Sequence, residues 1–376
     1  MLSELVGFPT ISSDSNLELI DYAEARLKAA GARTRRVPDA TGTKANLFAA
    51  IGPEAPGGVV LSGHTDVVPV EGQAWSTDPF TLTERDGRLY GRGSTDMKGF
   101  LACALAAADK FAAAGLPRPV YFALSHDEEV GCLGAPAMIE AMAAELPPIE
   151  AVIVGEPTEM KVVTGHKGLH SFRVELTGKE AHSSLVREGA CASTYAIPLM
   201  MSLHEEAAAM EAAAPPDSPF DPPFGTLTVG RMGGGEAVNI LTGRAWFEFL
   251  IRPAPWDDSN ALEARLREKA AEVETHMRRY APEAKVEVIT RSNAPPLKPE
   301  TDGAAEQLAR AITGDNQTRV VSFGTEAGQF QGAGLSTVVC GPGSIAQAHQ
   351  PNEFIEVSQL RAGLGFMDAL VKHMAQ

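Results

Sequence analysis

The sequence predicts an α/β fold in two domains, in which a mostly parallel sheet flanked by helices is interrupted by a smaller α+β domain. Three observations support this prediction. The chain has 376 residues, longer than a single compact core usually grows. In its first 165 residues, short continuous apolar segments alternate with alanine-rich helical ones, a pattern typical of a parallel sheet covered on both faces. From about residue 171 the strands alternate apolar and polar residues instead, which indicates an antiparallel sheet with one exposed face.

The predicted elements of the larger domain begin with a helix over residues 17–30. Its apolar side chains recur on roughly one helical face, and Gly31 follows as a stop. Apolar strands and helices then alternate, in the order strand 58–62, helix 100–114, strand 120–124, helix 136–144 and strand 151–154. The same style returns near the end of the chain, with a helix at 303–312, a strand at 337–340 and a helix at 357–374.

The smaller domain is predicted as an insertion over residues 166–285. Phe172, Val174 and Leu176 share one face of its first strand, and polar side chains alternate with them. Further elements follow in the order helix 190–211, strands 226–229 and 245–251, and helix 259–280. We therefore expect residues 1–165 and 286–376 to form the host domain around this insertion.

The composition excludes several classes of partner. Lysine and arginine number 32 against 48 aspartates and glutamates, a formal net charge of −16 that disfavours binding to nucleic acids or anionic lipid surfaces. No apolar stretch is long and uncharged enough to span a bilayer, and no basic-then-apolar signal segment opens the chain. The four cysteines form no CxxC pair, so neither a disulfide framework nor a thiolate zinc site is indicated, and we expect a reducing cytoplasm.

Acidic and histidine side chains follow four predicted strands at the point where each strand ends. They are His64 and Asp66, then Glu128 and Glu129, then Glu156, and finally His349, while a glycine-rich loop at 91–99 places Asp96 just before a helix. In open α/β sheets, ligands and cofactors gather at the carboxyl ends of the strands, so we expect these segments to converge. Histidines and carboxylates without thiolates are the ligand set of zinc or a related divalent cation.

The local spacing of these residues is compatible with different chemical roles for neighbouring side chains in one site. His64 and Asp66 point the same way on an extended backbone, so Asp66 can accept a hydrogen bond from the ring nitrogen that does not face a metal. Glu128 and Glu129 point apart, so one can bind metal while the other faces substrate as a base. Taken singly, a lone histidine is more often a core or surface residue, and a Glu-Glu pair is usually a solvated turn. The loop at 91–99 also lacks the spacing of dinucleotide-binding and phosphate-binding loops, so the metal prediction depends on the joint occurrence of these clusters.

Six motifs, in order and over nearly the whole chain, resemble one family of enzymes. They are GHTDVVP (63–69), GRGSTDMKG (91–99), SHDEEVG (125–131), GEPT (155–158), AHSS (181–184) and AHQPNEF (348–354). Together they resemble the co-catalytic zinc amidohydrolase and aminoacylase family, which includes acetylornithine deacetylase, succinyl-diaminopimelate desuccinylase and a related carboxypeptidase. Within that family, the segments 324–328 and 340–345 are most similar to the acetylornithine deacetylases.

The resemblance implies two divalent cations, zinc with cobalt as an alternative. By the match of motifs, His64, Asp96 and Glu156 would hold one cation. Asp96, Glu129 and His349 would hold the other, so that Asp96 bridges the two. The resemblance also implies a catalytic domain interrupted by a lid domain that forms a homodimer, in agreement with the change of pattern at about residue 171.

The family resemblance also implies roles outside the ligand set. Asp66 would orient the histidine ligand beside it, and Glu128 would be the general base. His182, in the lid, matches the histidine that completes the active site of the neighbouring subunit. Asn239 and Arg252 match lid residues that contact the substrate carboxylate. After the asparagine the family usually continues with an Ile-Pro pair, whereas Leu241 and Thr242 follow here.

The activity implied by the resemblance is hydrolysis of the acetyl amide of alpha-N-acetyl-L-ornithine to acetate and L-ornithine, a step of arginine biosynthesis. A buried ornithine ammonium needs a carboxylate partner, and Glu326, in a loop that begins at Gly324, is the candidate, with a solvated loop glutamate as the alternative. Desuccinylation and broad aminoacylase activity stay open, since the metal motifs do not distinguish acyl groups. A non-catalytic dimeric binding protein is a further alternative, against which the retention of every ligand and Glu128 counts. A serine hydrolase is not favoured, because the chain has no GxSxG motif.

Overall fold

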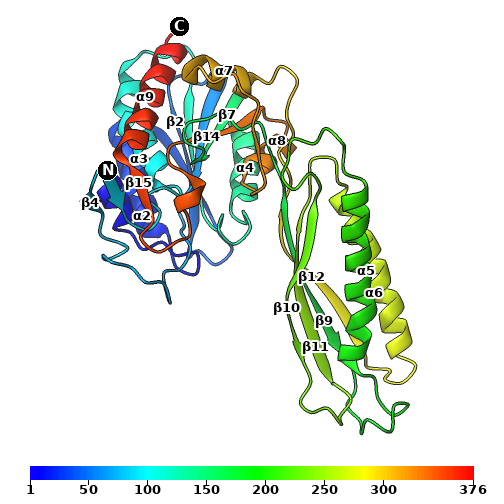
Figure 1. Cartoon of the computed structure of the whole chain (residues 1–376). Helices are drawn as coiled ribbons and strands as arrows, with labels where there is room; N and C mark the ends of the chain where they lie inside the picture. The colour runs from blue at the N-terminus through cyan, green and yellow to red at the C-terminus, as the bar shows by residue number, and fades with distance from the viewer. The chain divides into compact units, whose positions relative to one another are not determined.

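The computed structural model describes all 376 residues, which form two compact units (Figure 1). The first unit is assembled from three stretches of the chain, Met1–Gly165, Leu297–Val320 and Thr325–Gln376. The second consists of His166–Pro296 and the short segment Val321–Gly324. No helix in either unit has both the length and the apolar character needed to cross a membrane.

The first unit is built on a six-stranded sheet. In spatial order its strands are β1 (Arg33–Pro38), β2 (Ala45–Ile51), β6 (Val120–Ser125), β3 (Gly58–His64), β7 (Ile149–Pro157) and β14 (Thr337–Gly341). The last four run parallel to one another, while β1 and β2 pair antiparallel at one edge. This confirms the predicted mostly parallel sheet. The two antiparallel strands were not predicted from the sequence, and β1 is largely polar because it lies at the edge.

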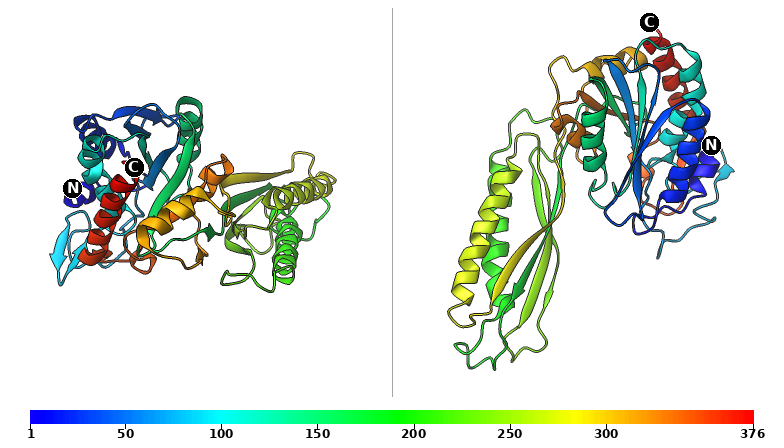
Figure 2. Two further views of the ribbon diagram at one scale, coloured as in Figure 1. Left: turned by 90° about the horizontal axis from the view of Figure 1, so that it is seen from above. Right: turned by 180° about the vertical axis from the view of Figure 1, so that it is seen from behind.

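Helices cover both faces of this sheet, as Figures 1 and 2 show. On one face lie α2 (Leu17–Ala29), α3 (Lys98–Ala113) and α9 (Val357–Met374), with the short α1 (Leu2–Val6) packed on α3. On the other lie α4 (Ala135–Glu145) and α8 (Ala327–Gly332). Helix α7 (Ala304–Thr313) packs against β7, β14 and α9, on the side of the sheet that α3 and α9 cover. The helices predicted from apolar periodicity are therefore present within a few residues of their expected ends.

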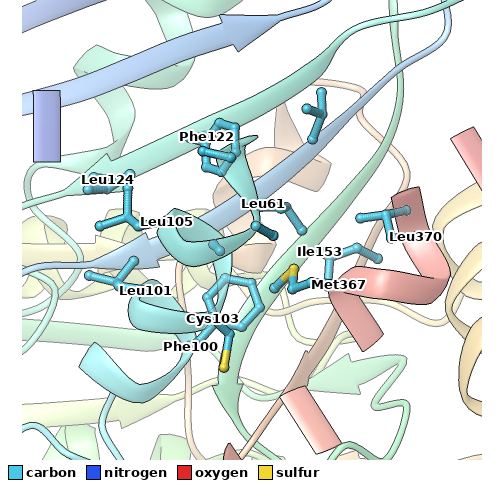
Figure 3. Close-up of a cluster of buried hydrophobic side chains, with 14 of the residues drawn as sticks. Leu61, Phe100, Leu101, Cys103, Leu105, Phe122, Leu124, Ile153, Met367 and Leu370 are labelled. Atoms are coloured by element: carbon cyan, nitrogen blue, oxygen red, sulfur yellow. The ribbon is translucent and has the colours of Figure 1, made fainter. Parts of the chain in front are cut away.

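The main core lies between the sheet and the α3–α9 face (Figure 3). Leu61, Phe122 and Ile153, from three neighbouring strands, are buried together with Phe100 of α3 and Met367 of α9. Burying one such side chain stabilises the fold by about 1.5–3 kcal/mol. Because the parallel strands are covered on both sides, their central residues are apolar on both faces, which is why they were recognisable as continuous apolar segments.

The second unit is a four-stranded antiparallel sheet with two helices on one face. Its strands, in spatial order, are β10 (Thr226–Gly234), β11 (Arg244–Arg252), β9 (Leu169–Thr177) and β12 (Lys285–Ala294). The helices α5 (Ala192–Ala212) and α6 (Ser259–Met277) cover the face on which Phe172, Val174 and Leu176 are buried. The alternation of apolar and polar residues in the sequence therefore matches the alternation of buried and more exposed side chains in the structure.

The end of the inserted unit differs from the expected one. The boundary predicted from the sequence lies at residue 285, whereas the second unit continues to Pro296. The reason is β12, which begins at Lys285 and pairs with β9 along its length, so residues 286–294 belong to the sheet of the second unit. Shorter elements complete the chain: β4 (Thr83–Arg85), β5 (Arg88–Tyr90), β8 (Gly165–His166), β13 (Val320–Val321), β15 (Phe354–Glu356) and the 3-10 helix η1 (Ile345–Gln347).

Candidate metal centre

The five residues expected to bind metal lie together in the first unit, at the carboxyl ends of its parallel strands. His64 ends β3, Glu156 lies at the end of β7, and Glu129 follows β6. Asp96 precedes α3, and His349 lies between β14 and β15, on a backbone with a left-handed φ of 61°. The parallel strands thus bring side chains from distant parts of the sequence to one edge.

His64 is the centre of the first group of ligand atoms. Its Nε2 lies 3.0 Å from Oδ1 of Asp96 and 3.6 Å from Oε1 of Glu156. The imidazole and both carboxylates are almost completely buried. One ligand atom from each of His64, Glu128 and Glu156 also lies within 4.8 Å of the others, so the expected base borders the first group.

A second group shares Asp96 with the first. Nε2 of His349 lies 3.2 Å from Oδ2 of Asp96 and 2.9 Å from Oε2 of Glu129. His64, Asp96 and Glu129 in turn have ligand atoms within 4.8 Å of one another. The two oxygens of Asp96 therefore face different histidines, which is the arrangement that a carboxylate bridging two cations requires.

Burial and mutual repulsion set the protonation of the carboxylates. Burial, offset by His64 and reinforced by repulsion from Glu129 and Asp96, raises the pKa of Glu128 to about 8. Burial likewise raises the pKa of Glu129 to about 7. Burial, followed by repulsion from Asp96, raises the pKa of Glu156 well above its ordinary value. Asp96 differs, because hydrogen bonds from two histidines outweigh burial and lower its pKa.

Asp66 supports both His64 and the loop of the base. Its backbone oxygen lies 2.9 Å from Nδ1 of His64, whereas its carboxylate is 3.6 Å away, so the nearer partner of the ring is the carbonyl and not the expected carboxylate. The carboxylate instead accepts the backbone N–H groups of Glu128 at 3.1 Å and Glu129 at 3.2 Å. The hydroxyl of Ser12 donates to the same carboxylate at 2.7 Å.

Glu326 is buried beneath the strand ends, with only 1% of its surface exposed. Its Oε1 accepts the Ser62 hydroxyl at 2.6 Å and its Oε2 accepts the Ser125 hydroxyl at 2.6 Å. The first serine lies two residues before His64, and the second is the last residue of β6. Glu326 is therefore not a solvated loop residue. Its contact with a substrate ammonium remains a prediction. Its hydrogen bonds indicate a second role, which is to join the ends of β3 and β6.

His182 and Asn239 are neighbours at one end of the second unit. His182 forms a bridge with Ile240, and the backbone N–H of Ser183 donates to the carbonyl of Asn239 at 2.9 Å. Nδ1 of His182 accepts the backbone N–H of Ser184 at 3.2 Å, which leaves Nε2 as the ring nitrogen that carries a proton. The exposed imidazole thus presents an N–H donor.

Arg252 ends β11 in the same unit, and its Nη1 is buried without a hydrogen-bond partner. Burial lowers the pKa of this guanidinium. Lys167 lies close enough to repel it, but its ammonium group is satisfied by the carbonyls of Pro222 at 2.8 Å and Phe224 at 2.7 Å. Gly324 also belongs to this unit, where a Cβ would lie 3.0 Å from the carbonyl of Lys167.

Comparison with known protein families shows which family contains this chain. The peptidase family M20/M25/M40 matches residues 60–373, a range that contains all five expected ligands and Glu128. This chain belongs to that family. An M20 enzyme is a metal-dependent hydrolase of amide bonds, so the predicted reaction class and the predicted metal requirement are confirmed.

Curated M20 relatives match the chain almost from end to end. An acetylornithine deacetylase of Myxococcus xanthus is 39% identical over 364 residues, which cover 96% of this chain and 92% of that protein. Acetylornithine deacetylases of Klebsiella pneumoniae and Pasteurella multocida are 35% and 33% identical, covering 98% and 94% of this chain and 95% and 92% of theirs. The family resemblance inferred from the six motifs is therefore confirmed.

Several solved structures share the fold. An M20 metallo-carboxypeptidase from Sulfolobus solfataricus aligns with a TM-score of 0.78 at 19% identity, covering 100% of this chain and 98% of its own. Human carnosine dipeptidase 1 aligns with a TM-score of 0.70 at 22% identity, with coverage of 100% and 96%. A Bacillus subtilis M20 peptidase described as dinuclear and metal-binding aligns with a TM-score of 0.63 at 16% identity, with coverage of 100% and 96%.

Several residues around the centre carried no recognisable signal in the sequence. Ser12 is 54 positions from the Asp66 that it contacts. Cys132 donates its thiol to Oε1 of Glu128 at 3.2 Å, and the only available clue was its place four residues after the base. Glu353 lies inside the motif 348–354, so its presence was noted, but nothing in the sequence indicated what it contacts.

Proposed function

We propose that this M20 hydrolase removes the acetyl group of alpha-N-acetyl-L-ornithine, giving acetate and L-ornithine. The observation that carries the proposal is the convergence of the five expected ligands around Glu128, in a chain that matches acetylornithine deacetylases over nearly its whole length. Such a reaction supplies ornithine, and we assign the protein to arginine biosynthesis in the cytoplasm. Four free cysteines, three of them buried, are compatible with a reducing compartment.

The donor set fits two divalent cations, and we propose zinc, with cobalt as a substitute. Four carboxylates crowd the site, and no lysine or arginine forms an ion pair with any of them. Such a concentration of buried negative charge needs cations for compensation. Imidazole and carboxylate ligands without thiolates suit zinc in a catalytic site. His64, Asp96 and Glu156 would hold one ion, and Asp96, Glu129 and His349 the other.

The chain supplies the proton transfers and the anion-stabilising donor. Bound cations would polarise the acetyl carbonyl and make an attacking water more acidic. Glu128 takes a proton from that water and returns it to the nitrogen of the departing amine, so the water oxygen ends in acetate. The partner subunit's His182 donates its Nε2–H to the oxygen on which negative charge develops. Arg252, with its free Nη1, contacts the substrate carboxylate, as does Asn239 of the partner subunit, which lies beside His182.

The second unit offers a surface for the homodimer that this scheme needs. Strand β10 is an edge strand, and it exposes Val229 and Met232. On α5, which packs against β10, Ile197 and Met201 are each about half exposed. An apolar edge strand beside an apolar helix face is suited to pairing with a second copy of itself about a two-fold axis. We propose that two chains associate through this surface.

A substrate panel tests the proposed activity. Purified protein is stripped of metal, reloaded with zinc and assayed on acetyl-, succinyl- and formyl-amino acids. We expect the highest kcat/KM for acetylornithine. Preference for succinyl-diaminopimelate would instead make the enzyme a desuccinylase, and equal rates on many acetyl-amino acids would make it an aminoacylase. No turnover of any substrate by the zinc-loaded protein would favour the non-catalytic binding protein.

A further inference from the structure

The carboxylate of Glu353 is buried against the loop that carries Asp96. Glu353 is only 1% exposed, although it lies in a connecting segment just before β15. Its Oε1 accepts the backbone N–H groups of Thr95 at 2.9 Å and Asp96 at 3.1 Å. Its Oε2 accepts the backbone N–H of Gly93 at 3.0 Å. Three backbone donors from one loop therefore converge on a single side chain.

Arg92 extends this contact towards His349. Its Nη1 donates to Oε2 of Glu353 at 2.8 Å, and both side chains are 1% exposed. Its Nη2 donates to the side-chain oxygen of Gln73, whose Nε2 donates in turn to the carbonyl of His349 at 3.0 Å. The guanidinium also lies 5.1 Å from the centre of the Trp75 ring. Hydrogen bonds thus connect the segment before Asp96 with the segment that carries the other histidine ligand.

The loop at 91–97 needs such a partner because no strand pairs with it. Backbone N–H groups that are buried outside secondary structure must find acceptors, and here one carboxylate provides them. The loop is also tightly packed: Gly93 has a φ of 77°, and a Cβ there would lie 2.7 Å from the side chain of Val67. Glu353 accepts four hydrogen bonds, two on each oxygen, so its carboxylate is used by the protein and is not a further metal ligand.

We propose that Glu353 is a positioning residue of the metal centre. It fixes the backbone of Asp96, and so the direction of the carboxylate that faces both histidines. Through buried Arg92 and partly exposed Gln73, the same network fixes the backbone of His349. Groups that orient metal ligands change metal affinity or activity by about 10–100-fold when they are altered. The inference rests on the proposed metal site and is independent of the proposed substrate.

The variant Glu353→Gln tests this role. Glutamine keeps the size of the side chain but replaces one acceptor oxygen with an NH2 group, which then faces N–H donors. We expect zinc affinity, measured by competition with a chromophoric chelator, to fall about 10–100-fold. The circular dichroism spectrum should stay unchanged. At saturating zinc, kcat should fall while KM stays nearly constant, because the substrate contacts are untouched. The matched control is Glu356→Gln, an exposed position in β15, which should bind zinc as the wild type does.

The second variant, Gln73→Met, keeps the proposal testable if Glu353→Gln does not fold. Gln73 is partly exposed and lies outside helices and strands. Its replacement breaks the connection from Arg92 to His349 and removes the acceptor of the Trp75 Nε1–H, while Glu353 keeps its contacts with the loop at 91–97. Here we expect weaker binding of one of the two zinc ions. Wild-type zinc affinity in folded Glu353→Gln would overturn the proposal. If that variant does not fold, wild-type zinc affinity in Gln73→Met would overturn it. An equal loss of zinc affinity in the control Glu356→Gln would overturn it as well. Tight zinc binding without turnover of acetylornithine would contradict the proposed substrate instead.

Discussion

His182 and Arg252 lie at opposite ends of the sheet of the second unit. His182 bridges to Ile240, before β11 begins, and Arg252 is the last residue of β11. Strand β11 alone spans about 25 Å at ~3.3 Å per residue. In an N-acetyl amino acid, by contrast, the acetyl carbonyl and the carboxylate are separated by only a few bonds. One chain therefore cannot present both residues to the same substrate molecule, so the roles proposed for them require a second chain to supply one of them.

Mixing two inactive variants tests this sharing. Subunits with His182→Ala retain a complete metal site, and subunits with Glu128→Gln retain the histidine donor. After subunit exchange, we expect about a quarter of wild-type activity, since half of the dimers are mixed and each mixed dimer has one complete site. The measurement is the rate of acetate release before and after exchange. Mixtures that exchange subunits but stay inactive would show that the donor comes from the same chain.

The dimer surface can be tested separately with Met232→Arg. Met232 is 70% exposed on edge strand β10, and a two-fold axis would bring two introduced charges into one apolar contact. We expect the dissociation constant of the dimer to rise about tenfold or more, measured by sedimentation equilibrium. Leu364→Arg, at an exposed apolar position of α9 in the first unit, is the control. An equal change in both variants would contradict the assigned surface.

Replacement of the proposed base should separate chemistry from metal binding. We expect Glu128→Gln to lower kcat by about 10²–10⁴, the contribution typical of general acid–base catalysis. Zinc content should stay near that of the wild type, because the five ligands are unchanged. Metal analysis and steady-state rates on one preparation provide the check. Substantial turnover by the metal-loaded variant would remove Glu128 from the role of base.

Glu326→Gln distinguishes ammonium recognition from internal support. The sequence predicts a selective loss of kcat/KM for acetylornithine, by about 1.5–3 kcal/mol, with little effect on acetylmethionine. The structure predicts comparable losses on both substrates, because the carboxylate is buried and both oxygens already accept serine hydroxyls. We expect the second outcome. A loss confined to acetylornithine would restore Glu326 as the partner of the substrate side chain.

The stability of the metal-free protein should fall as the pH rises. The pKa values of Glu128 and Glu129, about 8 and 7 in the folded chain, lie above the ordinary value of 4.5. A raised carboxyl pKa means that the folded state binds more protons than the unfolded one, so the contribution of these two groups to stability is fully present below pH 4.5 and is lost as the pH rises through 7 to 8. We expect the urea midpoint of the stripped protein to fall between pH 5.5 and about 8.5.

Zinc should reverse this trend, because it binds the deprotonated ligands and its affinity rises with pH. The check is a series of urea denaturation curves at three pH values, with and without zinc. Identical pH dependence in the two series would show that the crowded carboxylates are not the zinc site.

The parts of the fold that the sequence predicted are those whose local pattern matches their surroundings. Strand β7 was recognisable because its central residues are buried on both faces. Strand β1, with the sequence RTRRVP, was missed because an edge strand needs few apolar residues. Strand β12 was missed because much of it is exposed, and the boundary predicted at residue 285 was therefore wrong.

The candidate site likewise contains residues that the sequence predicted and contacts that it did not. Ligands could be predicted because residue types and strand ends are visible in the sequence, as for His64 and Glu156. The supporting contacts could not, since they depend on long-range geometry: the carboxylate of Glu353 reaches the backbone of Asp96 across 257 positions. Nor could composition alone show that Glu326 is buried, because a loop glutamate is usually exposed.

The first unit is assembled from three separate stretches of the chain, and this affects how the protein folds during synthesis. During synthesis, the whole second unit leaves the ribosome before β14. One edge of β7 therefore stays unpaired until β14 has been synthesised. His349 and Glu353 emerge later still, and the metal centre cannot close until the chain is almost finished. Long-range parallel pairing is slow, and unpaired strand edges promote aggregation. A nascent or truncated chain that stops before β14 is therefore expected to depend on chaperones and to bind zinc poorly, however well its second unit has folded.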